Sequence, residues 1–443
     1  MHKILLFLIC LIPLFLDENE LSFYEPINYL IFFIFYIIKV LKNKKTFFYP
    51  SSLFIIYICL NYTFGSFLYN GNLFDDYLNG LIDHRLSLKR ITINNFFLFF
   101  SIVYLNYKFK LNRTFINKFK FDFKNSKIVF VYGIMLMLTF SFLDFNLDFI
   151  GGEGSLSNIP KSIGAIILFI YASKNRAPYK YLIYISVFLI MSYVSFEDKR
   201  EAILLVLTYV ILEYKVNLKT FKLKDFFQLF TISFLSLTLI IVMSIKRGYG
   251  DFVKIDDSEN IFELFPYVPQ YISSDFFLAS LANNLEVSYS YAHSNRAVDY
   301  AIKNDVLLLG STFLKPLFLF VPRAIFKSKP QSMIDRYTKT FSSQQRANGV
   351  SWPVNFIAEF FWNFSYFGFI LIIPFLAFFD TLFSYFFDQS NKIKTYSIVL
   401  PLFMMNQWIV LVRGSGLEHF LLDFIIGSIF IIPLFKLPKS LND

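Results

Sequence analysis

Long uncharged stretches, separated by shorter polar segments, dominate the pattern of residues along the chain. The stretch at 226–245, FFQLFTISFLSLTLIIVMSI, carries no charge over 20 residues, and a helix of about 20 residues crosses a hydrocarbon core about 30 Å thick. These stretches are continuously apolar rather than alternating, so they predict helical spans and not the strands of a membrane barrel. Twelve spans are expected, near residues 3–16, 26–41, 47–68, 91–107, 128–145, 162–173, 181–196, 201–214, 226–245, 365–387, 395–412 and 420–435.

The first apolar stretch allows two interpretations. His2 and Lys3, followed by ILLFLICLIPLFL, fit the start of a signal peptide. The residues that come next, DENE at 17–20, contain no small-residue cleavage site. We therefore expect a short span that is retained.

Lysine and arginine concentrate in alternate connections between the expected spans. Because short cytoplasmic loops carry the basic excess, both chain termini are expected in the cytoplasm. The segment 246–353 is then expected to form a large external loop, between a bundle of about nine spans at 1–245 and about three spans at 354–443. The basic residues of the expected cytoplasmic loops are Lys42, Lys44, Lys45, Lys108, Lys110, Arg113, Lys118, Lys120, Lys124, Lys127, Lys174, Arg176, Lys180, Lys215, Lys219, Lys222, Lys224, Lys392 and Lys394.

One apolar segment inside this loop, VLLLGSTFLKPLFLFV at 306–321, could be mistaken for a further span. Lys315 and Pro316 interrupt it. If it crossed the membrane, the basic loops that follow would lie outside, against the orientation rule. We expect a re-entrant or interfacial element instead.

Composition favours an all-α polytopic membrane protein, since 56% of the residues are hydrophobic, 21% aromatic and only 17% charged. The net charge of +10 belongs largely to the loops just named and requires no nucleic acid. Cys10 and Cys59 both fall inside expected spans, with no paired spacing. The chain has no HExxH, no Walker A loop and no GxGxxG. We therefore expect neither a metal nor another cofactor.

Basic residues also recur where the expected spans meet the outside, which runs against the orientation rule. A single long cation at a helix end can simply extend toward water, but the repeated set favours an anion. Guanidinium groups stay charged and bind phosphate through paired hydrogen bonds, and polyprenyl carriers present diphosphates at such a surface. Fixed cations would stabilise a diphosphate leaving group without a metal. The set comprises Lys199, Arg200, Lys246, Arg247, Arg323, Lys329, Arg346 and Arg413.

Four blocks occur in order in the C-terminal half of the chain. They are IKRGYGD at 245–251, FVPRAIFKSKP at 320–330, NGVSWPVNFIAEFFWNFSYFGF at 348–369 and NQWIVLVRGSGLEHF at 406–420. This ordered set, placed around one large external loop, resembles the Wzy-type oligosaccharide repeat-unit polymerases, which include O-antigen and enterobacterial common antigen polymerases. The N-terminal half is similar to that family only in hydropathy.

The resemblance implies a glycosyltransferase of the bacterial inner membrane, with GT-C-like architecture and a periplasmic active site. Such an enzyme transfers a growing glycan from undecaprenyl diphosphate to the non-reducing sugar of a lipid-linked repeat unit, without a metal. The partners it implies are the lipid-linked substrates and a Wzz-type chain-length regulator. The residues it implies as diphosphate ligands are Arg200, Arg247, Arg323 and Arg413, supported by Lys246, Lys329 and Arg346.

The acceptor hydroxyl would need a general base. The candidates near the cations are Asp335, Glu359, Glu418 and His419. Glu359 lies in FIAEFFWNF, between Trp352 and Trp362, whose rings could stack on sugar faces. A glutamate at the entry of a span, or a histidine at a helix start, is equally compatible with a structural role. Which residue acts as the base therefore stays open.

Two other functions fit parts of the same pattern. A lipid-linked glycan ligase would share the donor and the external arginines but use a different acceptor, and only the order of the blocks favours the polymerase. A flippase or secondary transporter would fit twelve spans, but it predicts an internal repeat and ionisable residues near the bilayer midplane. The sequence shows no such repeat, and its external cations gather at span ends.

Overall fold

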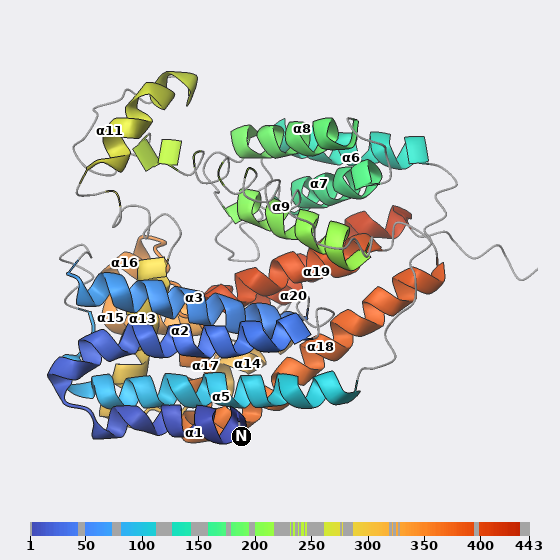
Figure 1. The fold of residues 1–443 in the computed structure, drawn as a ribbon. Helices are drawn as coiled ribbons and strands as arrows, with labels where there is room; N and C mark the ends of the chain where they lie inside the picture. Colours follow the sequence, from blue (N-terminus) through green and yellow to red (C-terminus); the bar gives the residue numbers. More distant parts are fainter. Residues whose placement is uncertain are drawn as a thin grey trace, which may run out of the picture. The chain divides into compact units, whose positions relative to one another are not determined.

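Helices make up every regular element in the part of the chain that the computed structural model describes (Figure 1). The chain forms two compact units, and neither is continuous in sequence. Unit 1 comprises Met1–Phe115, Phe277–Thr381 and Trp408–Leu421, and unit 2 comprises Ile116–Phe276, Leu382–Gln407 and Leu422–Asp443. The described residues are 2–42, 49–72, 81–111, 126–142, 158–173, 179–194, 200–216, 231, 234, 238, 241–242, 244–245, 261–274, 277, 287–318, 321, 325–326, 328–393 and 398–434.

Four helices in these ranges are long and apolar enough to cross a membrane: Pro50–Asn70, Ser87–Leu105, Phe356–Phe387 and Leu417–Leu434. Large apolar side chains such as Phe64, Phe378 and Ile429 are more than half exposed on them, as expected of helices that face lipid. The chain is thus compatible with a helical membrane protein. The number twelve stays a prediction. Shorter apolar helices cover Lys3–Phe15, Ser22–Ile38, Lys127–Phe140, Asn158–Ser173 and Tyr179–Met191.

Unit 1 begins with four helices that run side by side (Figure 1): α1 (His2–Leu11), α2 (Glu18–Lys42), α3 (Pro50–Asn70) and α5 (Ser87–Leu111). Proline at the first position of α3 has no N–H to satisfy.

A buried carboxylate accepts hydrogen bonds from the first turn of α3. Asp380, on α18 (Gly368–Ile393), accepts hydrogen bonds from the Ser51 backbone N–H at 2.9 Å and the Ser51 hydroxyl at 2.6 Å. It also accepts one from the Tyr104 hydroxyl of α5 at 3.1 Å. The carboxylate therefore caps one helix and ties it to two others.

A polar helix, α13 (Val287–Asn304), lies in the core of unit 1 and packs against α3 and α17 (Phe356–Phe364). Its side chains at Ser290, Asn295 and Asp299 are buried. The approach to α3 is close because α3 carries glycine at position 65, where a Cβ atom would overlap the ring of Tyr291. Part of the predicted external segment 246–353 is therefore packed inside a helical core. The two compact units do not end at residues 245 and 353, where domain boundaries were predicted.

The apolar segment that begins at Val306 is not one long helix within its described residues. A turn at Leu309 and Gly310, both with positive φ, precedes α14 (Ser311–Leu314) and the 3-10 helix η7 (Lys315–Phe318). These elements are too short to cross a bilayer. The chain then continues through α15 (Met333–Phe341), α16 (Ser343–Ala347), α17 and α18.

The motif RGSG at 413–416 covers the end of η10 (Leu411–Ser415) and the single residue that separates it from α20 (Leu417–Ile431). Gly414 has φ 120°, and a Cβ atom there would overlap the Val354 backbone. Gly416 has φ 86°, and a Cβ atom there would lie 2.8 Å from Glu418 Oε2. Only glycine fits these two positions without strain, and the turn folds the Glu418 carboxylate back under Gly416.

Unit 2 contains α6 (Ser126–Phe142), α7 (Asn158–Ser173), α8 (Tyr179–Val194) and α9 (Arg200–Val210), which pack on one another. Gly164 allows α7 to approach α6, since a Cβ atom there would lie 2.7 Å from a backbone oxygen of α6. After α9 the chain forms a π-helical turn, η5 (Ile211–Val216), whose buried glutamate pairs with a lysine of α8. The described parts of η6 (Ile261–Tyr267), α11 (Val268–Ile272) and α19 (Val399–Val410) up to residue 407 also belong to this unit.

Candidate functional site

Five ionisable side chains from separate segments of unit 1 meet at one place. They are Lys315, Asp335, Arg346, Glu359 and Glu418, and we call them the Lys315 cluster. Lys315 Nζ donates to Glu418 Oε1 at 2.9 Å and to Asp335 Oδ2 at 3.3 Å. Arg346 Nη2 lies 2.5 Å from Asp335 Oδ1. Two carboxylates thus share two cations, and Glu359 is the third carboxylate nearby, interacting electrostatically with Lys315 and Glu418.

Short helices position the two members of the cluster that are best exposed. Asp335 lies in the first turn of α15, where its backbone N–H donates to the Ser332 side chain at 3.1 Å. Arg346 lies in the last turn of α16 and also donates to the Ser351 hydroxyl at 2.7 Å. Burial raises the pKa of Asp335, but Lys315 and Arg346 outweigh it and hold that pKa below its usual value. Asp335 is therefore an anion at neutral pH.

Glu359 is the most secluded member of the cluster. It lies in the first turn of α17 and is only 2% exposed. Its Oε1 accepts a hydrogen bond from the Thr312 hydroxyl at 2.7 Å, and Asn363 holds that hydroxyl in turn through a bond of 2.8 Å. Glu359 interacts electrostatically with Glu418 and with Lys315. An uncharged hydrogen-bond donor is therefore the direct partner of this carboxylate.

Three of the four predicted base candidates, Asp335, Glu359 and Glu418, lie in this cluster. His419 follows Glu418 and is half-buried. Lys315 is not among the predicted site residues, because the Lys-Pro pair was interpreted only as a break in an apolar segment. A cation inside such a segment is itself a sign of function, and that sign was available.

The predicted diphosphate ligands are described only in part. Arg346 belongs to the cluster, and Arg413 is half-buried in η10, five residues before Glu418. Lys329 Nζ donates to the Val321 backbone oxygen at 3.4 Å. Arg200 is the first residue of α9, in unit 2, and its side chain lies outside the described residues, as do Lys246, Arg247 and Arg323. Convergence of the arginines stays a prediction.

The two tryptophans predicted to stack on sugars are buried against protein side chains. Trp352 is 8% exposed and stacks on His293, with ring centroids 4.9 Å apart. Trp362 is 1% exposed, and its indole N–H donates to the Ala297 backbone oxygen. Sugar stacking stays a prediction that requires their neighbours to move.

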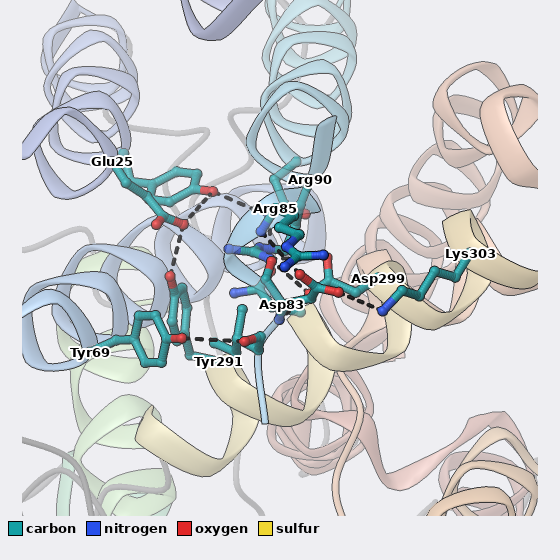
Figure 2. Close-up of polar contacts among 12 residues, drawn as sticks. Glu25, Tyr69, Asp83, Arg85, Arg90, Tyr291, Asp299 and Lys303 are labelled. Carbon is teal, nitrogen blue, oxygen red and sulfur yellow. Dashed lines mark hydrogen bonds and ion pairs between the residues drawn. The ribbon is translucent and has the colours of Figure 1, made fainter. Parts of the chain in front are cut away.

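A second group of charges joins four segments of unit 1 (Figure 2). We call it the Arg90 network. Arg90 of α5 is 1% exposed, and its Nη1 donates to the two carboxylate oxygens of Asp299, on α13, at 2.8 and 3.0 Å. The same Nη1 donates to the Asp83 backbone oxygen at 3.2 Å. Arg90 thereby connects the turn before α5 with α5 itself and with α13.

Two more contacts extend the Arg90 network, as Figure 2 shows. Lys303 Nζ, near the end of α13, donates to Asp83 Oδ2 at 2.6 Å, and this bond lowers the pKa of Asp83. At the other side, Glu25 Oε1 of α2 accepts a hydrogen bond from the Tyr291 hydroxyl at 2.8 Å. The network therefore links α2, α5, α13 and the turn at Asp83, and it explains how so polar a helix as α13 can be buried.

Burial also perturbs a histidine of α13. His293 is 0% exposed, and its Nδ1 lies 3.0 Å from the Tyr337 hydroxyl oxygen. Burial, with a smaller effect of Arg296, lowers the pKa of His293 from 6.5 to about 3. The imidazole is therefore neutral in the folded chain at any pH above this value.

We expect the stability of unit 1 to fall on acidification from pH 6.5 toward pH 3. In this window the unfolded chain binds a proton at His293 and the folded chain does not, so the free energy of unfolding decreases by up to about 1.4 kcal/mol per pH unit. Equilibrium unfolding in detergent at pH 7, 5 and 4 measures the effect. His293→Gln should flatten the pH dependence, and an unchanged slope in that variant would contradict the assignment.

No group of three or more His, Cys, Asp or Glu side chains among the described residues could hold a metal ion. Comparisons of the chain with models of protein families, with curated proteins and with solved structures gave no match. The chemistry of the side chains themselves therefore carries the functional argument.

Proposed function

We propose that the chain is a membrane glycosyltransferase that transfers a growing glycan from undecaprenyl diphosphate to a lipid-linked repeat unit. The observation that carries this proposal is the Lys315 cluster. It pairs two carboxylates with two cations, and a third carboxylate, Glu359, interacts with them electrostatically, next to the start of two apolar helices, α17 and α20. A polyprenyl carrier with a charged head group would meet these side chains at a membrane surface. The ordered sequence blocks support the same reaction.

The reaction needs a base for the acceptor hydroxyl and positive charge for the leaving group. Asp335 and Glu418 both form ion pairs with Lys315, so each of these carboxylates already holds a cation. Glu359 has a hydroxyl, that of Thr312, as its direct partner. In the proposal Glu359 takes the proton of the acceptor hydroxyl, whose oxygen attacks the anomeric carbon. The carbon–oxygen bond to the diphosphate breaks, and its electron pair stays on the diphosphate beside Lys315 and Arg346.

The finer features belong to the same proposal. They are twelve spans, a GT-C-like architecture, a bacterial inner-membrane location with both termini cytoplasmic, and a periplasmic site. Further cations would complete diphosphate binding, and a chain-length regulator would be the protein partner. The cations proposed for this role are Arg200, Lys246, Arg247, Arg323, Lys329 and Arg413.

Purified protein mixed with a lipid-linked repeat unit is expected to give a ladder of products without added nucleotide or metal. Lys315→Met should reduce the rate at least about a hundredfold, because a cation next to the leaving group is lost. Gel or mass analysis of the glycans measures the result. Lys339→Met, which removes an exposed cation of α15, should leave the ladder unchanged.

The other outcomes separate the rival functions. A single transferred unit would favour a glycan ligase. No turnover, with substrate translocation in proteoliposomes, would favour a flippase. A Lys315→Met variant that folds normally and retains full activity would remove the Lys315 cluster from the mechanism.

A further inference from the structure

We infer that Lys315 and Arg346 form a phosphate subsite, and that the Asp335 carboxylate occupies this subsite until a phosphate group replaces it. The inference deepens the proposed function and rests on it for the identity of the natural ligand. It assigns Asp335 the role of a displaceable internal anion rather than that of a base.

The geometry resembles that of a bound phosphate. Asp335 Oδ2 receives Lys315 Nζ at 3.3 Å, and Asp335 Oδ1 lies 2.5 Å from Arg346 Nη2. One anion thus bridges two cations, with a different oxygen toward each. A phosphate group presents the same pair of oxygens, adds a third, and carries more negative charge, so it would compete well for both cations.

Access distinguishes this end of the cluster from the rest. The side chains of Asp335 and Arg346 are 19% and 27% exposed, whereas that of Glu418 is only 4% exposed. A ligand would therefore reach the Asp335 end first. Glu418, being secluded and held under Gly416, keeps Lys315 in place through its own hydrogen bond of 2.9 Å.

The Asp335 side chain can leave without unfolding α15. Other contacts hold the helix: its Tyr337 hydroxyl lies 3.0 Å from His293, and its Thr338 hydroxyl accepts the Trp352 backbone N–H at 3.1 Å. Ser332 caps the helix by accepting a hydrogen bond from the Asp335 backbone N–H at 3.1 Å, and this cap does not require the carboxylate. Rotation of the Asp335 side chain would therefore release the Arg346 guanidinium from Asp335 and leave Lys315 with Glu418 as its remaining carboxylate partner.

Binding of inorganic diphosphate to the full-length protein in detergent, measured by calorimetry, tests the inference without turnover. We expect Asp335→Asn to bind about tenfold more tightly than the wild type, because the competing charge is gone while the shape is kept. Asp335→Glu keeps that charge and should not show the gain. Lys315→Met and Arg346→Gln should each weaken binding at least about tenfold.

Two control variants make the same changes of charge at positions outside the Lys315 cluster. Asp305→Asn and Lys339→Met alter exposed residues of unit 1 and should leave the affinity within about twofold of wild type. Equal or weaker binding by Asp335→Asn, in a variant with unchanged thermal unfolding, would overturn the inference. An equally large gain in affinity in Asp305→Asn would also overturn the inference, since the gain would then reflect net charge alone.

A competition arm identifies the source of the phosphate. Undecaprenyl diphosphate in the micelles is expected to displace inorganic diphosphate from the wild type. If it does not, the subsite stands for free phosphate and the proposed carrier is contradicted. Conversely, a product ladder together with unaltered diphosphate binding in all the variants would uphold the glycosyltransferase and overturn the subsite. The two proposals can therefore fail separately.

Discussion

Replacing Arg90 by methionine is expected to lower the free energy of unfolding by about 3–5 kcal/mol, because it would leave buried carboxylates without their cation. Arg90 makes two hydrogen bonds to Asp299, and both side chains are almost completely enclosed. Glu25, only 3% exposed, also interacts with the Arg90 charge. Methionine replaces the apolar stem of the arginine but carries no charge, so the loss would include the cost of leaving the buried carboxylates without their cation.

Equilibrium unfolding in detergent micelles would measure this loss. Arg85→Met is the matched control, because Arg85 precedes the same helix and is exposed, and it should change stability by less than about 0.5 kcal/mol. The double variant Arg90→Met/Asp299→Leu should recover part of the loss, since both charges are then gone. A double variant no more stable than Arg90→Met would show that Asp299 is not the origin of the effect.

Replacing Glu359 by glutamine is expected to reduce the turnover number by about 10²–10⁴-fold, the usual contribution of a general base. Glutamine has the same shape, and its carbonyl oxygen can still accept the Thr312 hydrogen bond. The KM for the lipid-linked unit should change little, because Glu359 is not assigned to phosphate binding. The fold should also be retained, so the loss would be chemical.

Initial rates of repeat-unit consumption would measure the Glu359 effect, with thermal unfolding as the check on folding. Thr312→Val removes the hydroxyl partner but leaves the carboxylate. It should therefore cost much less activity and change the pH profile of the rate. If Glu359→Gln retained more than a tenth of the wild-type turnover, the base would have to be sought at Glu418 or His419.

The helical, membrane-compatible character of the chain follows from its sequence because apolar runs are a local signal. The predicted bases are a different case. Asp335, Glu359 and Glu418 were selected for their proximity to cations along the chain, and the structure brings them together around Lys315. Their pairing could not be predicted, because it depends on the positive-φ turns at Gly310 and Gly416.

The burial of α13 could not be predicted from the sequence at all. The segment VSYSYAHSNRAVDYAIKN is rich in polar residues and fits an external loop. What allows it into the core is a pairing between Asp299 and Arg90, which are 209 residues apart. The pattern of residues within the helix cannot indicate a partner so far away in the sequence. The hydrogen bond from Tyr291 to Glu25 joins residues still farther apart in the sequence and could not be predicted either.

The glycine at position 65 has a consequence beyond close packing. Tyr291, whose ring fills the space that a methyl group on α3 would need, also donates a hydrogen bond of 2.8 Å to Glu25. The absence of a side chain at this one position of α3 thus sets how near the Tyr291 phenol comes to a carboxylate on the neighbouring helix α2. The electrostatics of the buried network are, in this respect, controlled by a residue that has no side chain and no charge.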